Sequence, residues 1–174
     1  MTNYKELADM LLPDVYASPE DIMGIYPQRR LCEGAVVARF APSPTGMLHI
    51  GGLYAALVSE RLAHQSRGVF YLRIEDTDKK REVKHSIPDI IESMAHFGIR
   101  FDEGETVAGT ETGSYGPYRQ SARASIYKVF VKYLIEKGLA YPCFCTEGEL
   151  ESLRKVQEEA GVRPGYYGKW ALHR

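Results

Sequence analysis

Residues 34–75, GAVVARFAPSPTGMLHIGGLYAALVSERLAHQSRGVFYLRIE, combine two short β-branched runs with one long helical pattern. The first run is bounded by Gly34 and Pro42, which is typical of a short strand. A loop with two prolines and a glycine follows it, and apolar residues then recur at three- and four-residue spacing from Ile50 until Gly68 ends the helix. A second strand follows directly. The order strand, loop, helix, strand predicts a right-handed βαβ unit with parallel strands, the first half of a doubly wound α/β sheet.

The rest of the sequence supplies helices separated by proline- and glycine-rich connections. Ser86 is expected to cap one helix, and TEGE predicts a capping box between Thr146 and Glu149 at the start of the last helix. The glycine-rich segment 101–120 is expected to be a loop. Helices are expected at residues 3–12, after Ser18, at 87–97, at 121–137 and after Thr146, and a short strand at 140–145.

The composition is that of an ordinary folded protein. The 174 residues are 44% hydrophobic and 26% charged, with a formal net charge of -1. These values exclude a disordered or collagen-like chain, and no apolar stretch approaches the roughly 18 residues that a membrane span needs. The first residues lack the apolar core of a secretion signal, and the odd count of three cysteines suits a reducing compartment. We therefore expect a cytoplasmic protein with no membrane contact.

The sequence PTGMLHIGG places His49, Gly51 and Gly52 at the start of the expected helix, just beyond the carboxyl end of the first strand. Open α/β sheets bind ligands at this edge, and the free N–H groups of a helix N-terminus attract phosphate. The glycines would let a phosphate or a base approach the backbone, and the histidine could donate a hydrogen bond to a phosphate oxygen. An equally weighted alternative is that the glycines serve helix–strand packing and that His49 is an ordinary helix cap.

Charged residues flank the same edge of the expected sheet. Arg39 lies on the first strand, and Glu75, Asp76 and Asp78 follow the second strand. Because adjacent parallel strands lie about 5 Å apart, these groups could face one crevice. Arg39 could then bind a carboxylate through two hydrogen bonds while Glu75 holds an ammonium, as in a receptor for an α-amino acid. A solvated salt-bridge cluster is the competing interpretation, and spacing alone favours it.

Four motifs, RFAPSPTGMLHIGG, YLRIEDTD, FDEG and GPYRQS, resemble in order and spacing the class I glutamyl-tRNA synthetases. HIGG is similar to that family's form of the HIGH signature, with Gly52 at the position of the last histidine. The loop APSPTG and the motif RIEDTD resemble the glutamate enzymes more than the glutaminyl-tRNA synthetases. The resemblance extends from about Tyr26 to the end of the chain, and the proline-bearing leader is similar to the N-terminal extension of some bacterial members.

The resemblance implies a Rossmann-like, HUP-type class I synthetase fold. It divides the chain into an N-terminal extension at 1–33, a parallel-sheet half-domain at 34–118, and the start of an inserted α+β acceptor-binding domain at 119–174. The family's KMSKS-type lysine loop is absent from these residues, so the remainder of the synthetase polypeptide is expected and the isolated chain is expected to be inactive. Because parallel sheets are normally covered on both faces, such a half-domain should expose apolar surface.

The implied reaction is ATP-dependent activation of L-glutamate to glutamyl adenylate, followed by transfer to the 3′ end of tRNA-Glu. Mg²⁺ would accompany ATP and neutralise its phosphates. His49, together with Gly51 and Gly52, would be catalytic by stabilising charge at the α-phosphate. The positions that match the family's glutamate-binding residues are Arg39, Ala41, Ser43 and Glu75. Those that match its ATP-binding residues are Thr45, Gly46, His49, Gly51 and Gly52. A tRNA contact is implied for Asp78, Tyr118, Arg119 and Gln120, and a structural role is the alternative for the last three.

Cys143 and Cys145 are too close in sequence for an ordinary disulfide, so metal ligands or reduced thiols are expected. In some family members a similar CxC joins later Cys, His or Tyr residues around a structural Zn²⁺. His173 and one of Tyr166 or Tyr167 could complete such a site, but structural zinc requires four ligands, mostly thiolate and imidazole. We expect reduced thiols rather than zinc.

Two other functions stay open at the level of sequence. A paralogue similar to the glutamyl-queuosine tRNA synthetases would lack an anticodon domain, although those proteins start close to the first strand and keep the second catalytic half. A non-catalytic module that binds a nucleotide, glutamate or a tRNA acceptor end is favoured by the missing lysine loop. Glutamate-dependent ATP–pyrophosphate exchange would separate the enzyme from the module.

Overall fold

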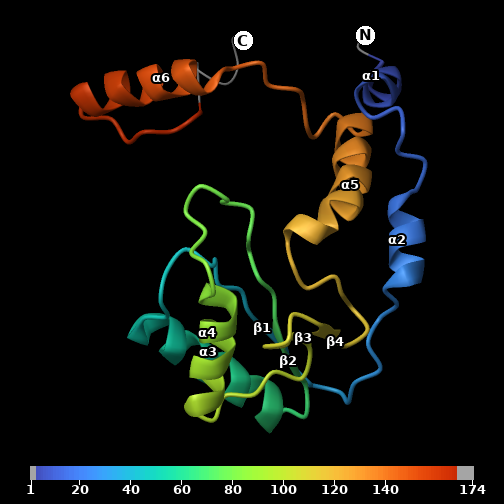
Figure 1. The fold of residues 1–174 in the computed structure, drawn as a ribbon. Helices are drawn as coiled ribbons and strands as arrows, with labels where there is room; N and C mark the ends of the chain where they lie inside the picture. The colour runs from blue at the N-terminus through green and yellow to red at the C-terminus, as the bar shows by residue number, and fades with distance from the viewer. Residues whose placement is uncertain (1–2, 168–174) are drawn as a thin grey trace.

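The computed structural model describes residues 3–167, and its two parallel strands lie in the lower half of the view in Figure 1. The strand β1 (Val37–Phe40) pairs residue for residue with β2 (Val69–Leu72). The helix α3 (Ile50–Gln65) connects them. The unit of strand, loop, helix and parallel strand expected from the sequence is therefore confirmed, with strands that are shorter than expected.

The sheet continues beyond β2 through two isolated parallel bridges. Leu72 N donates to Glu103 O over 2.9 Å, and Ile74 N donates to Tyr118 O over 2.9 Å. Gln120 N in turn donates to Ile74 O over 2.8 Å. The chain near Glu103 and near Tyr118 therefore lies beside the carboxyl end of β2, a position that no sequence pattern indicates.

The glycine-rich segment 101–120 is not entirely the loop that the sequence predicts, because it contains a small hairpin. The strand β3 (Gly104–Glu105) pairs antiparallel with β4 (Glu111–Thr112). Strands of two residues are too short to show the alternation from which a strand is predicted. Gly104 has a φ of 135° and approaches β2 so closely that an added Cβ would lie 2.7 Å from Leu72 O, so the position requires glycine.

The hydrophobic core lies on the face of β2 to which Phe70 and Leu72 both point. Phe70 packs against Ala56 and Ala63 of α3 and against Met94 of the helix α4 (Ser86–His96). The small alanine side chains allow α3 to lie close to the sheet. A second cluster of buried side chains contains Leu72 and Ile74, which follow Phe70 at two-residue spacing, together with Ile87 of α4.

The core does not bury all of the large apolar side chains from whose spacing α3 is predicted. Tyr54 and Leu62 are 68% and 55% exposed, whereas Ala56 and Ala63 are fully buried. The helix therefore presents large apolar side chains to solvent, and Val37 of β1 is also exposed. The predicted exposure of apolar surface is therefore observed on α3 and β1.

The start of α4 differs from the prediction. Ser86 is the first helical residue rather than the cap, and the cap position is occupied by His85 at a φ of 67°. This left-handed residue turns the chain into the helix, and its side chain makes no capping hydrogen bond. The face of α4 that packs toward the core includes Ile90 and Met94, which are both buried.

The leader forms two helices that pack against a later helix (Figure 1). The helices α1 (Tyr4–Leu11) and α2 (Pro19–Ile25) both contact α5 (Ala124–Glu136), which follows the 3₁₀ turn η1 (Ser121–Arg123). Lys132 Nζ of α5 donates to Asp9 Oδ1 over 2.7 Å and to Val15 O over 2.9 Å. The helices predicted for the leader and for residues 121–137 are thus confirmed, and an ion pair joins them.

The helix α6 (Glu147–Glu159) lies at the carboxyl-terminal end of the described chain, apart from the sheet (Figure 1). Its predicted capping box is confirmed, because Thr146 N donates to Glu149 Oε2 over 2.8 Å and Glu149 N donates to Thr146 Oγ1 over 3.3 Å. The strand predicted at 140–145 is wrong. That segment is irregular, and no strand within residues 3–167 pairs with it, so its backbone groups have no ladder to join.

His64 joins α3 to the chain beyond α4 through two carboxylates. Its Nδ1 lies 3.0 Å from Glu60 Oε1, and its Nε2 lies 3.0 Å from Asp102 Oδ2. Burial lowers the pKa of His64, but the hydrogen bond to Asp102 and the negative charges of both carboxylates outweigh it, so the pKa lies above the ordinary 6.5. Protonated His64 therefore stabilises the fold fully below about pH 6.5, and this contribution is lost as the pH rises through the folded-state pKa.

We expect the urea midpoint of the protein to fall as the pH rises above about 6.5 and through the raised pKa of His64, and the substitution His64→Gln to flatten that fall. His96→Gln is a matched control, because His96 is an exposed histidine near the end of the neighbouring helix α4. The control should keep the full pH dependence. An equal slope in His64→Gln and in the unsubstituted protein would contradict the role given to this ion pair.

Candidate active site

Arg39 and Glu75 meet at the carboxyl edge of the sheet. Arg39 lies on β1 and Glu75 follows β2, and parallel pairing brings these ends to the same edge. Arg39 Nη1 lies 3.4 Å from Glu75 Oε1. Glu75 N also donates to Pro42 O over 2.9 Å, which ties the backbone of Glu75 to the loop after β1. The structure thus brings together the two residues predicted to hold the carboxylate and the ammonium of an amino acid.

Arg73 is a third member of this cluster that sequence reasoning missed. Arg73 Nη2 donates to Glu75 Oε1 over 2.6 Å, the same oxygen that Arg39 approaches. Among the described residues, Glu75 Oε2 receives no hydrogen bond. One carboxylate oxygen is therefore open to an ammonium, and two guanidiniums against one carboxylate leave a positive charge that suits a carboxylate ligand. The two-residue spacing of Arg73 and Glu75, which places them on one side of an extended chain, is the sequence signal that could have found this contact.

The loop after β1 and the start of α3 enclose a cavity of about 450 Å³. Several of the residues predicted to bind ATP or glutamate line it: Ser43, Thr45, Gly46, His49 and Gly52. Phe40 and Ile90 supply apolar walls, which is the combination of apolar lining and few polar groups that small-molecule sites use. The other predicted residues, Arg39, Ala41, Gly51 and Glu75, lie outside this lining.

His49 caps α3 with its side chain. Its Nδ1 accepts from Gly51 N over 3.1 Å and from Gly52 N over 3.3 Å. His49 thus occupies the cap position that the alternative interpretation expects, and the two amides expected to face a phosphate are already bonded to His49. Because Nδ1 is an acceptor, the neutral ring carries its proton on Nε2, which can donate to a ligand oxygen. Gly51 keeps this arrangement, since an added Cβ there would lie 3.1 Å from the imidazole.

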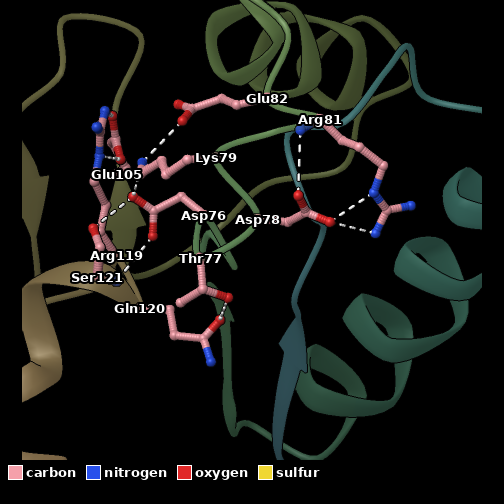
Figure 2. A network of polar contacts seen from close by, with 10 residues as sticks. All are labelled: Asp76, Thr77, Asp78, Lys79, Arg81, Glu82, Glu105, Arg119, Gln120 and Ser121. Carbon is pink, nitrogen blue, oxygen red and sulfur yellow. Dashed lines mark hydrogen bonds and ion pairs between the residues drawn. The ribbon is translucent and has the colours of Figure 1, made fainter. Parts of the chain in front are cut away.

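Asp76 anchors the EDTD motif to Ser121, the last residue of the GPYRQS motif (Figure 2). The side chain is 2% exposed, and it accepts from Ser121 N over 2.9 Å, from Ser121 Oγ over 2.6 Å and from Lys79 Nζ over 3.1 Å. Burial alone raises the pKa of Asp76, but the hydrogen bonds from Ser121 and Lys79 outweigh it and hold the pKa below its ordinary value. The carboxylate next to Glu75 in sequence is thus a buried structural anchor.

The residues predicted to contact tRNA lie around this anchor, and their side chains are already paired. Arg119 forms a two-bonded ion pair with Glu105, which is 5% exposed, and this hydrogen bonding raises the pKa of Arg119 (Figure 2). Thr77 Oγ1 donates to Gln120 Oε1 over 3.3 Å. Asp78 pairs with Arg81 at 2.6 Å, and this hydrogen bond lowers the pKa of Asp78.

Tyr118 is 2% exposed and belongs to the core rather than to a surface. Its hydroxyl donates to Glu103 Oε2 over 2.7 Å, and burial together with this bond raises the pKa of Tyr118 to about 12. This placement favours the structural alternative for Tyr118. The side chains of Arg119 and Asp78 remain partly accessible at 40% and 37%.

Cys143 and Cys145 converge on one tyrosine. Tyr166 Oη lies 3.5 Å from each Sγ, whereas Tyr167 Oη donates to Arg163 O over 2.5 Å and is turned to another partner. His173 lies outside the described residues. Within residues 3–167 no group of three His, Cys, Asp or Glu side chains is placed to hold a metal ion. The two thiols therefore share a phenol, which is not among the usual ligands of structural zinc.

The sequence model of the family described as "tRNA synthetases class I (E and Q), catalytic domain" matches residues 35–173. The chain belongs to this family. Its α/β fold with a parallel sheet is accordingly that of a class I synthetase catalytic domain, as the motifs predict. Among the described residues of this synthetase chain, no helix has the length and apolar character needed to cross a membrane.

Curated relatives of the chain are glutamate–tRNA ligases. The enzyme of Acetivibrio thermocellus is 57% identical over 99% of the synthetase chain and 32% of its own length. The enzyme of Clostridium perfringens strain 13 is 55% identical over 99% of the chain and 32% of its own length. The synthetase chain therefore spans about a third of the length of these relatives.

Solved structures agree with these relatives. The glutamate–tRNA synthetase of Elizabethkingia anophelis superposes with a TM-score of 0.66 at 41% identity, covering 74% of this chain and 25% of that one. A glutamate tRNA ligase from Elizabethkingia meningosepticum, solved in complex with its amino acid, superposes with a TM-score of 0.64 at 41% identity over 73% of this chain and 24% of that one.

Proposed function

We propose that this chain is the amino-acid- and ATP-binding part of a glutamate–tRNA ligase, which activates L-glutamate to glutamyl adenylate and transfers it to the 3′ end of tRNA-Glu. The observation that carries the proposal is the Arg39–Glu75–Arg73 cluster at the carboxyl edge of the sheet. It offers positive charge to a carboxylate and one free carboxylate oxygen to an ammonium. The neighbouring cavity and the His49-capped helix suit a nucleotide.

Each group has a definite task in this proposal. Arg39 moves away from Glu75 and binds a carboxylate of the incoming glutamate. Glu75 Oε2 accepts a hydrogen bond from the ammonium of the same glutamate, and Arg73 keeps the Glu75 side chain oriented. The reacting carboxylate oxygen attacks the α-phosphorus of ATP, and pyrophosphate leaves. His49 donates from Nε2 to an oxygen of the α-phosphate, where negative charge builds up in the transition state. Mg²⁺ bound with ATP would neutralise the phosphates.

The test is glutamate transfer by the protein expressed from its complete reading frame. Radiolabelled glutamate should become attached to tRNA-Glu in an ATP-dependent reaction, and glutamine should not replace it. Attachment to tRNA that lacks its 3′-terminal adenosine would indicate the queuosine-type activity instead. Binding of glutamate and ATP without any transfer would indicate the non-catalytic module.

The location and the division of the chain follow from the same proposal. We propose a cytoplasmic protein, because its tRNA partner and its reduced cysteines belong in that compartment. Residues 34–118 would form the first half of the catalytic domain, with 1–33 as an N-terminal extension. Residues 119–174 would begin the acceptor-binding insertion.

We propose that Cys143 and Cys145 are reduced thiols that hold no zinc, because the Tyr166 hydroxyl that lies 3.5 Å from both sulfur atoms is a phenol, which is not among the usual zinc ligands. We expect metal analysis of the purified protein to find zinc far below one ion per chain. Cys32→Ser is the matched control, since Cys32 is an exposed cysteine distant in sequence from the pair. One tightly held zinc per chain, lost in Cys143→Ser and kept in Cys32→Ser, would reverse this assignment.

A further inference from the structure

Residues 26–29 of the leader, here called the strap, lie against the turn at residues 115–118. Tyr26 Oη donates to Gly116 O over 2.6 Å, and Tyr115 Oη donates to Pro27 O over 2.8 Å. The two tyrosine rings also lie near each other, with centroids 6.4 Å apart. Residues almost 90 positions apart in the chain are therefore joined by two reciprocal hydrogen bonds.

Arg29 adds an ion pair to the contacts of the strap. Its guanidinium donates to Glu103 Oε1 over 2.6 Å and to Glu103 Oε2 over 2.5 Å, and it lies 3.7 Å from the centre of the Tyr115 ring. Both side chains of the ion pair are largely buried, at 17% and 13% exposed. A two-bonded arginine–carboxylate pair fixes position as well as supplying energy. Glu103 also accepts from the Tyr118 hydroxyl, so the strap, the turn and the chain after α4 share one carboxylate.

The chain that continues from the turn is hydrogen-bonded to both sequence neighbours of Glu75. Tyr118 O and Gln120 N bond to the backbone of Ile74, the residue before Glu75. Ser121 N and Oγ bond to Asp76, the residue after it, as Figure 2 shows. The other edge of this strand end is held by Pro42 O. The segment that carries Glu75 is therefore hydrogen-bonded along one edge to residues 118–121. These residues continue the chain from the turn that the strap contacts.

We propose that the strap positions the amino-acid site and that Arg29 is a positioning residue, acting through Glu103 and the 115–121 segment on Glu75. This inference rests on the proposed function. The strap precedes residue 35, where the match to the family model begins. Removal of the strap contacts should loosen the 118–121 edge and let Glu75 move relative to Arg39.

The first test measures amide hydrogen exchange in the protein expressed from its complete reading frame. Arg29→Ala should speed exchange about tenfold or more in peptides covering 74–76 and 118–121, while the peptide covering β1 keeps its protection. Arg30→Ala is the matched control, because Arg30 is the adjacent arginine, is exposed and makes no hydrogen bond or ion pair among the described residues. Tyr26→Phe, which removes only the bond to Gly116 O, should give a smaller effect at the same peptides.

The second test measures glutamate charging by the same variants at a temperature where all of them are folded. Arg29→Ala should raise KM for glutamate several-fold with a much smaller change in kcat, and Arg29→Lys should restore it only in part, because lysine keeps the charge but loses the two-bonded contact. Unchanged exchange at 74–76 and 118–121, or unchanged KM alongside lowered stability, would overturn the positioning role. Absence of charging in the unsubstituted protein would overturn the proposed function, and the exchange result would still decide whether the strap controls the strand end.

Discussion

Glu75→Gln is expected to lower kcat/KM for glutamate by about 10- to 150-fold in the protein expressed from its complete reading frame. The substitution keeps the shape of the side chain but removes the charge that would hold the substrate ammonium. A hydrogen bond to a charged group contributes about 1.5–3 kcal/mol, and each 1.4 kcal/mol corresponds to a factor of ten. Arg39 and Arg73 would also lose their shared anionic partner, which adds to the effect.

The loss should appear mainly as a raised KM for glutamate, with the KM for ATP nearly unchanged. Glu92→Gln is the matched control, since Glu92 is an exposed glutamate of α4 with no ion pair among the described residues. Arg39→Ala should raise the glutamate requirement by a similar factor without unfolding the protein. If Glu75→Gln and Arg39→Ala both required no more glutamate than the control, the crevice would be wrongly assigned.

Gly68→Ala is expected to destabilise the fold by about 3 kcal/mol, the upper range for forcing an extra methyl into a packed site. An added Cβ would lie 1.9 Å from Val36 O, and this oxygen already accepts from Val69 N over 3.1 Å. Relief of the clash therefore moves β1 away from β2 at the point where their pairing begins. The edge that joins Arg39 to Glu75 depends on that pairing.

Urea denaturation measures this prediction, with Gly148→Ala as the control. Gly148 lies in the first turn of α6, and an added Cβ there meets no atom within 4 Å, so alanine should be neutral or slightly stabilising. Equal midpoints for Gly68→Ala and Gly148→Ala would show that the strands can separate at Gly68 without cost.

Local sequence patterns were sufficient to predict those elements whose formation depends only on residues close together in the chain. The helix from Ile50, the two strands that flank it and the Thr146–Glu149 capping box all follow from short-range periodicity or capping chemistry, and all are confirmed. The strand predicted at 140–145 failed for the opposite reason. A strand requires a partner, and the alternation of residues within one segment says nothing about whether a partner lies beside it.

Some features of the candidate site could likewise be predicted from the sequence, and others could not. The convergence of Arg39 and Glu75 could be predicted, because parallel strands in sequence order must bring their carboxyl ends together. The role of His49 could not be decided, since a histidine at a helix start is equally suited to capping and to ligand binding until its Nδ1 is located. Arg73 was missed although its two-residue spacing from Glu75 places both side chains on one side of an extended chain, because that spacing alone does not show that the two side chains touch.

The sequence by itself determined the βαβ unit, the family and the edge of the sheet at which its charged residues gather, because all three depend on local periodicity and on motifs in order. Only the tertiary structure decided that Ser121 bonds to Asp76 and that Arg29 pairs with Glu103. These partners are 45 and 74 positions apart. Contacts at such separation depend on how the chain packs between them, and no short-range pattern records that packing.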